Sequence, residues 1–281
     1  MPLDFPPITI WIHGTNLSEL VIKPLRGITE KAFHKFFHCE PGLNLASTLS
    51  NEFHHAKITQ TLVKADPELF PLDTLYLFGW SGKLSSEERK KAAVQLYEEL
   101  QHLTKEFKSN YGRPPFLRLI THSHGGNVAL NLASINSKAN ALNIDELILL
   151  ACPVQQETEN FIKAPLFKNI YSLHSHWDVL QVLDPQGLPE FGQAIKQFFQ
   201  KGSIESLKDA FKQFEEQTFF SKRHFLPNKN LIQANLRKNN RNLLHVEFLL
   251  STFIEKLPGI LEEIKTKPRT NREKDWVIEF N

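Results

Sequence analysis

Short, continuous apolar runs alternate along this chain with stretches whose apolar residues recur every three or four positions. The runs lie at residues 8–12, 74–78, 116–120, 146–154, 169–174 and 230–236. Strands that are apolar at every position are typical of parallel sheets, because helices cover both faces of such sheets. The pattern therefore predicts an α/β protein with a mainly parallel central sheet and helices on both faces.

Helical periodicity is clearest after Ser85, where two serines precede Glu87 and Glu88 in a typical helix start. One apolar face then follows at helical spacing, and the segment 111–115 contains the Gly and Pro residues that end the helix. We expect a shorter helix near 45–55 and a closing helix from 243 to about 264. The run at 230–236 is predicted to be the last core strand.

Residues 185–228 differ from the rest of the chain. Their apolar residues follow helical spacing in two short patterns, and phenylalanines are frequent: Phe191, Phe198, Phe199, Phe211, Phe214, Phe219, Phe220 and Phe225. The chain shows no internal repeat and no Gly/Ser-rich linker. We therefore predict a single domain over residues 1–281, in which 185–228 form a helical cap inserted before the last strand.

The segment Thr121-His122-Ser123-His124-Gly125-Gly126-Asn127 joins an apolar strand to a helix with small residues in its first turn. A serine on such a sharp turn is held in a strained conformation, which exposes its hydroxyl group beside the amides of the first helical turn. Ser123 is therefore a candidate nucleophile. The usual G-x-S-x-G pattern has glycine where this chain has Thr121, and an ordinary glycine-rich turn is the alternative interpretation.

Three stretches together resemble lipase-like bacterial α/β-hydrolases. They are His13-Gly14 after an apolar strand, Trp80-Ser81-Gly82 followed by the helix with Glu88-Arg89 and Ala92-Ala93, and the elbow at 121–127. The likeness covers most of residues 8–155. It implies the α/β-hydrolase fold and serine hydrolase activity on carboxylic esters, without the two antiparallel strands that often begin that fold.

The resemblance also assigns the remaining site residues. The backbone amides of Thr15 and His124 would form the oxyanion hole. In this fold the acid and then the histidine follow the serine along the chain. Asp178 follows the strand at 169–174 and is the favoured acid, with Asp184 as the alternative. His245 is the favoured base, with His224 as the alternative. No cofactor and no metal are expected.

Two other interpretations compete with a serine hydrolase. Thr121-His122-Ser123-His124 begins like the T-H-x-H-x-D-H motif of zinc hydrolases, but Gly126 and Asn127 replace its next ligands. His174 and His176 are further possible ligands, although we expect these two side chains to face opposite ways. The other alternative is a binding protein that keeps the fold without catalysis.

Composition adds limits on partners and location. The net charge of +2 and the two cysteines, Cys39 and Cys152, give no reason to expect nucleic acid binding or a disulfide framework. No apolar run approaches the roughly 20 residues that span a bilayer. The N-terminus lacks a secretory signal, so we expect a cytoplasmic protein, with unmarked export as the alternative. The phenylalanine-rich cap favours an apolar ester or acyl substrate, and a lipid surface is a candidate partner.

Overall fold

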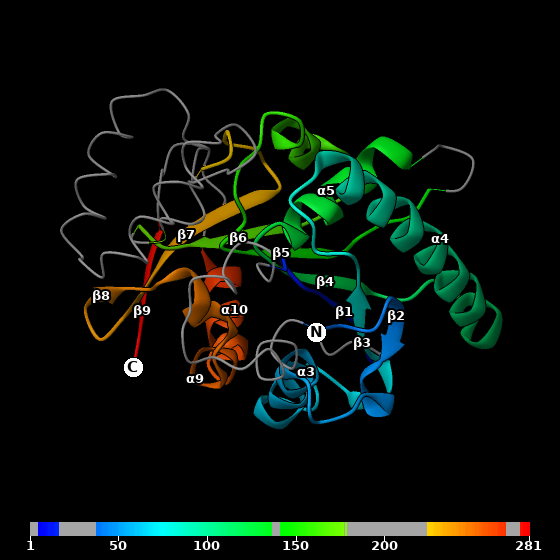
Figure 1. The fold of residues 1–281 in the computed structure, drawn as a ribbon, viewed down its shortest axis with the longest axis horizontal. Helices are drawn as coiled ribbons and strands as arrows, with labels where there is room; N and C mark the ends of the chain where they lie inside the picture. The colour runs from blue at the N-terminus through cyan, green and yellow to red at the C-terminus, as the bar shows by residue number, and fades with distance from the viewer. Residues whose placement is uncertain (1–4, 17–37, 137–140, 177, 179–223, 268–275) are drawn as a thin grey trace.

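The computed structural model describes residues 5–16, 38–136, 141–176, 178, 224–267 and 276–281 (Figure 1). Its strands form one sheet in the order β2-β3-β1-β4-β5-β6-β7-β8, and β9 pairs with β7. The strands are β1 (Ile8–Ile12), β2 (Gly42–Leu45), β3 (Leu75–Gly79), β4 (Leu117–His122), β5 (Glu146–Leu150), β6 (Ile170–His174), β7 (Leu231–Lys238), β8 (Arg241–Asn242) and β9 (Trp276–Phe280).

The sheet is mainly parallel. Neighbouring strands from β3 through β1, β4, β5 and β6 to β7 all run parallel, as do β7 and β9. The exceptions are β2, which is antiparallel to β3, and β8, which is antiparallel to β7. This sheet, with helices on both faces, has the α/β-hydrolase fold, so the predicted fold class is confirmed.

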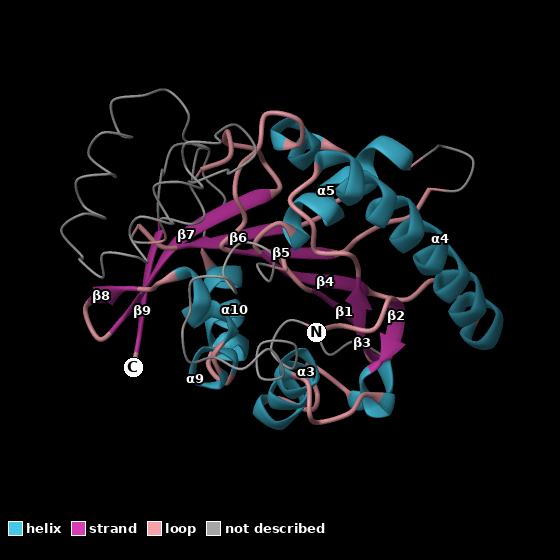
Figure 2. Cartoon of the chain, viewed as in Figure 1, coloured by secondary structure: helices cyan, strands magenta, loops and turns pink. Residues whose placement is uncertain are grey.

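Helices cover both faces of the sheet (Figures 1 and 2). On one face lie α4 (Ser86–Tyr111) and α5 (Gly125–Ile135), and on the other lie α3 (His54–Ala65), α9 (Ser251–Ile254) and α10 (Leu257–Thr266). Among the described residues, no helix is both long enough and apolar enough to cross a membrane.

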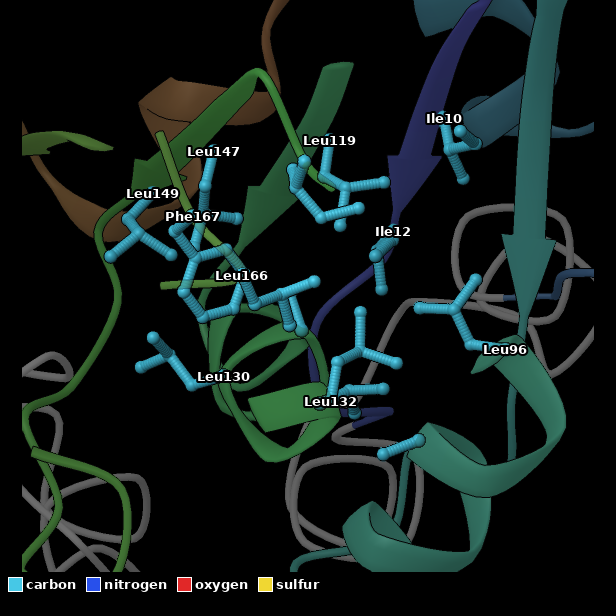
Figure 3. Close-up of a cluster of buried hydrophobic side chains, with 14 of the residues drawn as sticks. Ile10, Ile12, Leu96, Leu119, Leu130, Leu132, Leu147, Leu149, Leu166 and Phe167 are labelled. Atoms are coloured by element: carbon cyan, nitrogen blue, oxygen red, sulfur yellow. The ribbon is translucent and has the colours of Figure 1, made fainter. Parts of the chain in front are cut away.

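The strands separate two hydrophobic cores, which explains their continuous apolar sequences. In β1, the side chains of Ile8, Ile10 and Ile12 enter the core beneath α4 and α5, whereas Trp11 enters the opposite core. Figure 3 shows Ile10 and Ile12 beside Leu96 of α4 and the leucines of α5. Successive strand residues point to opposite faces, so a strand covered on both sides is apolar at most positions.

The predicted start of the long helix is confirmed by its cap. The Ser85 hydroxyl accepts a hydrogen bond from the Glu88 amide at 3.4 Å. Gly112 ends α4 with a φ of +73°, a left-handed conformation that glycine adopts at little cost.

Several elements differ from the sequence prediction. The sequence predicted no antiparallel strands before the strand at 8–12. The structure has one antiparallel strand at this edge of the sheet, β2, which follows β1 along the chain. The helix expected near 45–55 begins later, as α3, because residues 42–45 pair with β3. The run at 230–236 is not the last strand, since β9 follows it. Apart from residues 224–228, the predicted cap at 185–228 lies outside the described residues.

A buried ion pair links β4 to β5 on the face of α10. Arg118 Nε donates to Glu146 Oε2 at 2.6 Å, and Lys265 Nζ of α10 lies 2.5 Å from Glu146 Oε1. Burial alone would raise the pKa of Glu146, but the charges of Arg118 and Lys265 outweigh it and lower that pKa. The carboxylate therefore stabilises the fold in its ionised state.

Replacing Glu146 with Gln should lower the free energy of unfolding at pH 7 by about 3 kcal/mol or more, because Arg118 stays buried without a charged partner. Because the folded-state pKa is depressed, this stabilisation is present above the unfolded pKa and is lost as pH falls through the folded value. The deficit of the variant should therefore shrink below roughly pH 4. Urea unfolding of the wild type and the variant, at pH 7 and again below roughly pH 4, measures this change in the deficit.

Glu87→Gln is the matched control, since Glu87 pairs with Lys91 on the exposed surface of α4. That change should alter the unfolding free energy by no more than about 0.5 kcal/mol. Equal effects of the two variants would show that the buried pair does not stabilise the fold.

Candidate active site

Ser123 lies at the join between β4 and α5. Its φ is +52°, a left-handed conformation that is uncommon and strained for residues other than glycine. Two hydrogen bonds hold the turn: the Ser123 amide donates to the Leu150 carbonyl at 2.9 Å, and the Gly126 amide donates to the Ser123 carbonyl at 3.0 Å. The sheet and the first turn of α5 therefore enforce the strained conformation of Ser123.

The two glycines after the elbow are required by close packing. A Cβ atom on Gly125 would lie 2.5 Å from the His13 carbonyl oxygen, and one on Gly126 would collide with Cys152 Sγ. A Cβ on Gly14 would lie 2.9 Å from the Cβ of Ser123. The end of β1 and the elbow are thus in direct contact, which only glycine at these positions permits.

Thr121 occupies the position where the usual elbow pattern has glycine. It is fully buried, and its Oγ1 donates a hydrogen bond to the Ile148 carbonyl at 3.1 Å. The hydroxyl group therefore has a partner on β5, and the structure accommodates the β-branched side chain without opening the turn.

His13, at the end of β1, is fixed by Trp80 at the end of β3. Its Nδ1 donates to the Gly14 carbonyl at 2.7 Å, its Nε2 accepts from the Trp80 amide at 3.1 Å, and the Trp80 indole donates to the His13 carbonyl at 2.8 Å. Burial lowers the pKa of His13 to about 4. The imidazole is therefore neutral at pH 7 and holds the loop that begins at Gly14.

Asp178 and His245 form a buried pair. His245 Nδ1 lies 2.8 Å from Asp178 Oδ2 and 3.0 Å from Oδ1. The Asp178 side chain is fully buried, and a turn in which its amide donates to the Ser175 carbonyl at 3.1 Å positions it after β6. A carboxylate at Nδ1 fixes the imidazole orientation and leaves Nε2 able to accept a proton.

The residue before Ser123 anchors the backbone of His245. His122 Nε2 donates to the His245 carbonyl at 3.2 Å, and the two rings lie 4.7 Å apart between centroids. Burial, followed by the His245 ring nearby, lowers the pKa of His122 well below its usual value, so its ring is neutral. This contact brings His245 to the elbow.

Glu247 and Arg241 fix the start of the 3-10 helix His245–Leu249. Glu247 accepts from the Leu244 amide at 2.8 Å and binds the Arg241 guanidinium at 2.6 and 2.8 Å. His245 is therefore held at its backbone by His122, at its ring by Asp178 and at its helix start by Glu247.

The amides of Thr15 and His124 lie on the two segments that meet at the elbow. Within the described part of the chain, neither amide donates a hydrogen bond to another residue. His124 is the N-terminal cap of α5, where unpaired N–H groups and the helix dipole favour negative charge. Burial, followed by the charge of Arg89, lowers the pKa of the His124 imidazole well below its usual value.

The structure therefore brings Asp178 and His245 together, and His245 contacts His122, the residue before Ser123. His224, the alternative base, contacts His174, with 3.1 Å between their Nε2 atoms. Asp184 lies outside the described residues. Ser81, the other serine in a glycine-rich turn, is exposed and donates to Glu88 at 3.1 Å.

Sequence reasoning missed two features of the histidine arrangement. The first is the anchoring role of His122, which has no local signal because its partner lies far along the chain. The second is that His174 and His176 lie near each other, with ring centroids 5.8 Å apart. The expectation that they face opposite ways was wrong, because side chains of an extended segment alternate from one residue to the next, so residues two apart lie on the same face.

Neither a protein-family model nor a curated protein matches the chain. Among solved structures it is similar to the esterase Pf2001 from Pyrococcus furiosus, with 11% identity over 91% of this chain and 78% of that one, at a TM-score of 0.39. It is also similar to TT1662 from Thermus thermophilus, with 13% identity over 94% and 92% of the two chains, at a TM-score of 0.37. An esterase from the fungus Rhizomucor miehei shows 13% identity over 94% and 74%, at a TM-score of 0.41. Because these TM-scores are low, the fold is defined by the strand order and by the helices on both faces of the sheet.

Proposed function

We propose that this protein is a serine hydrolase of carboxylic esters, in which Ser123, Asp178 and His245 form the catalytic triad. The observation that carries the proposal is the buried pair between Asp178 and His245 at 2.8 Å, anchored through His122 beside Ser123. The left-handed conformation of Ser123 supports it independently. Serine is a weak nucleophile unless a base accepts its proton and a carboxylate orients that base.

In the first half of the proposed reaction, Ser123 Oγ attacks the ester carbonyl carbon while His245 Nε2 accepts the hydroxyl proton. The carbonyl oxygen becomes an oxyanion, and the Thr15 and His124 amides donate hydrogen bonds to it. The tetrahedral intermediate then breaks its bond to the alkoxy oxygen. His245 gives its proton to that oxygen, so the alcohol leaves and the acyl group remains on Ser123.

Water then hydrolyses the acyl group on Ser123, and His245 again transfers the proton. His245 Nε2 accepts a proton from the water as its oxygen attacks the acyl carbon. When the second tetrahedral intermediate breaks, the same proton returns to Ser123 Oγ and the carboxylic acid is released. Asp178 stabilises the imidazolium of His245 in both halves without itself accepting the proton. The reaction needs no cofactor.

The surface around His245 favours an apolar acyl group. Leu244, Val246 and Leu250 expose 51%, 47% and 40% of their surface, and the first two flank His245 directly. Grouped exposed apolar side chains are typical of surfaces that bind an apolar ligand, a partner or a lipid surface. We therefore propose esters with an extended apolar acyl chain as the substrate class.

Replacing Ser123 with Ala should abolish hydrolysis of aryl esters, with a fall in kcat of at least about 10⁴-fold. It should also abolish covalent labelling by a fluorophosphonate, detected by peptide mapping. Ser81→Ala is the matched control and should keep both properties. Unchanged turnover in Ser123→Ala would contradict the nucleophile, and an inert wild-type protein would favour the catalytically silent alternative.

Replacing Asp178 with Asn should lower kcat by about 10⁴-fold, because the amide cannot hold His245 in the required tautomer. Steady-state kinetics on the same ester measures the loss. Asp184→Asn should leave kcat close to the wild-type value. The opposite ranking of the two variants would assign the acid to Asp184.

Replacing Val246 with Ser should lower kcat/KM for an octanoate ester by roughly tenfold, because about 1.5 kcal/mol of apolar contact is lost. Activity on the matching acetate ester should stay within about twofold, since a short acyl chain does not reach Val246. Val94→Ser is the matched control, because Val94 on α4 exposes 44% of its surface, close to the 47% of Val246. A flat chain-length profile in Val246→Ser would exclude this surface from acyl binding.

A further inference from the structure

Three histidines meet at the carboxyl end of β6. His174 is the last residue of β6, His176 follows it two positions later, and His224 precedes β7. One ring nitrogen of each lies within 4.8 Å of the other two, and the Nε2 atoms of His174 and His224 are 3.1 Å apart. Neither His122 nor His124 belongs to this cluster.

β7 holds the first two of these histidines in place. His174 pairs in register with Asn235 of β7. The Oδ1 atom of Asn235 accepts a hydrogen bond from the backbone amide of His176 at 3.1 Å. The Nδ2 atom of the same side chain donates to Asn242 Oδ1 at 3.4 Å. The contact with Asn242 orients the Asn235 oxygen toward the backbone of His176.

The third histidine is anchored by the residue that follows it. The Phe225 amide donates to Gln233 Oε1 at 2.8 Å, and Gln233 Nε2 donates back to the Phe225 carbonyl at 3.1 Å. The Phe225 side chain is also buried. This reciprocal pair fixes the backbone next to His224 on β7, so all three histidines are positioned by the same two strands.

We propose that His174, His176 and His224 form a binding site for one Zn²⁺ ion. Imidazole nitrogens bind zinc at about 2.0–2.1 Å, so two ligands of a tetrahedral ion lie roughly 3.3 Å apart. The pair of His174 and His224 is already close to that separation. The exposed side chain of His176 can move toward the other two, which closes the ligand set.

The surroundings of the cluster suit such an ion. His174 is buried, His224 is half-buried and His176 is exposed, so the site is partly shielded and still open to solvent. Three imidazoles leave a fourth coordination position for water. The ion joins the β6 end to the start of β7, and therefore links the two ends of the segment 177–223. Binding to the folded state alone raises stability.

Zinc titration of the metal-free full-length protein, followed by calorimetry and elemental analysis, tests the site. We expect about one zinc per chain and a higher unfolding temperature with the metal. His176→Ala and His224→Ala should each weaken zinc binding at least about 100-fold, since even loss of groups outside the ligand set costs 10–100-fold. Co²⁺ alone should give the intense visible bands of a tetrahedral site in the wild-type protein and not in these variants.

Two controls make the outcome specific. His102→Ala removes an exposed histidine of α4 and should bind zinc like the wild type. Ser123→Ala should also bind zinc normally, so the metal site is tested independently of the proposed hydrolase activity. His176 is exposed, so its replacement removes no core packing, and circular dichroism checks that the variant is folded.

The proposal is overturned if the wild-type protein binds no zinc at micromolar concentrations. It is equally overturned if His176→Ala and His224→Ala bind zinc as tightly as His102→Ala does. In either case the 3.1 Å contact between His174 and His224 is a hydrogen bond between two imidazole rings and no part of a metal site.

Discussion

The structure depends on the close approach between the end of β1 and the turn that joins β4 to α5. Gly125 packs against the His13 carbonyl, and Gly14 packs against the side chain of Ser123. Larger residues at these glycines would separate the two segments. The same close approach brings the segment containing Thr15 next to Ser123, whose left-handed conformation is held by the sheet and the first turn of α5. One packing constraint therefore places the proposed nucleophile next to the proposed oxyanion hole.

Neutral histidines do much of the positioning around this turn. Burial lowers the pKa of His13 to about 4 and that of His122 well below its usual value, so both are uncharged at pH 7. A neutral imidazole has one donor and one acceptor, so it can bridge two backbone groups without the cost of a buried charge. His13 uses this capacity to link Gly14 with Trp80, and His122 uses its donor to hold the backbone of His245.

The sequence was most informative where the determining interactions are local. Buried parallel strands are apolar at most positions, and the sharp turn at Ser123 needs small residues within one turn of the serine, so both leave short patterns. The edge strand β2 and the final strand β9 leave no such pattern, because their pairing depends on partners far along the chain. The cluster at His174 was missed for two reasons. His174 and His176 were assigned to opposite faces although residues two apart in an extended segment share a face, and His224 lies far along the chain. The pairing of His245 with Asp178 was predicted from the chain order of the resembled fold, whereas the contact of His245 with His122 was not.

One short turn, from Ser175 to Asp178, connects the histidine cluster at the end of β6 with His245, which in turn contacts His122 at the end of β4. His176 and Asp178 lie within this turn, and the Asp178 amide donates to the Ser175 carbonyl at 3.1 Å. Asn235 of β7 holds the beginning of this turn through the His176 amide, and His245 contacts its end through Asp178. A zinc ion on His176 would therefore restrain the same backbone that carries the proposed catalytic carboxylate. The ion would act on catalysis by positioning Asp178, and the bond changes would stay with Ser123 and His245.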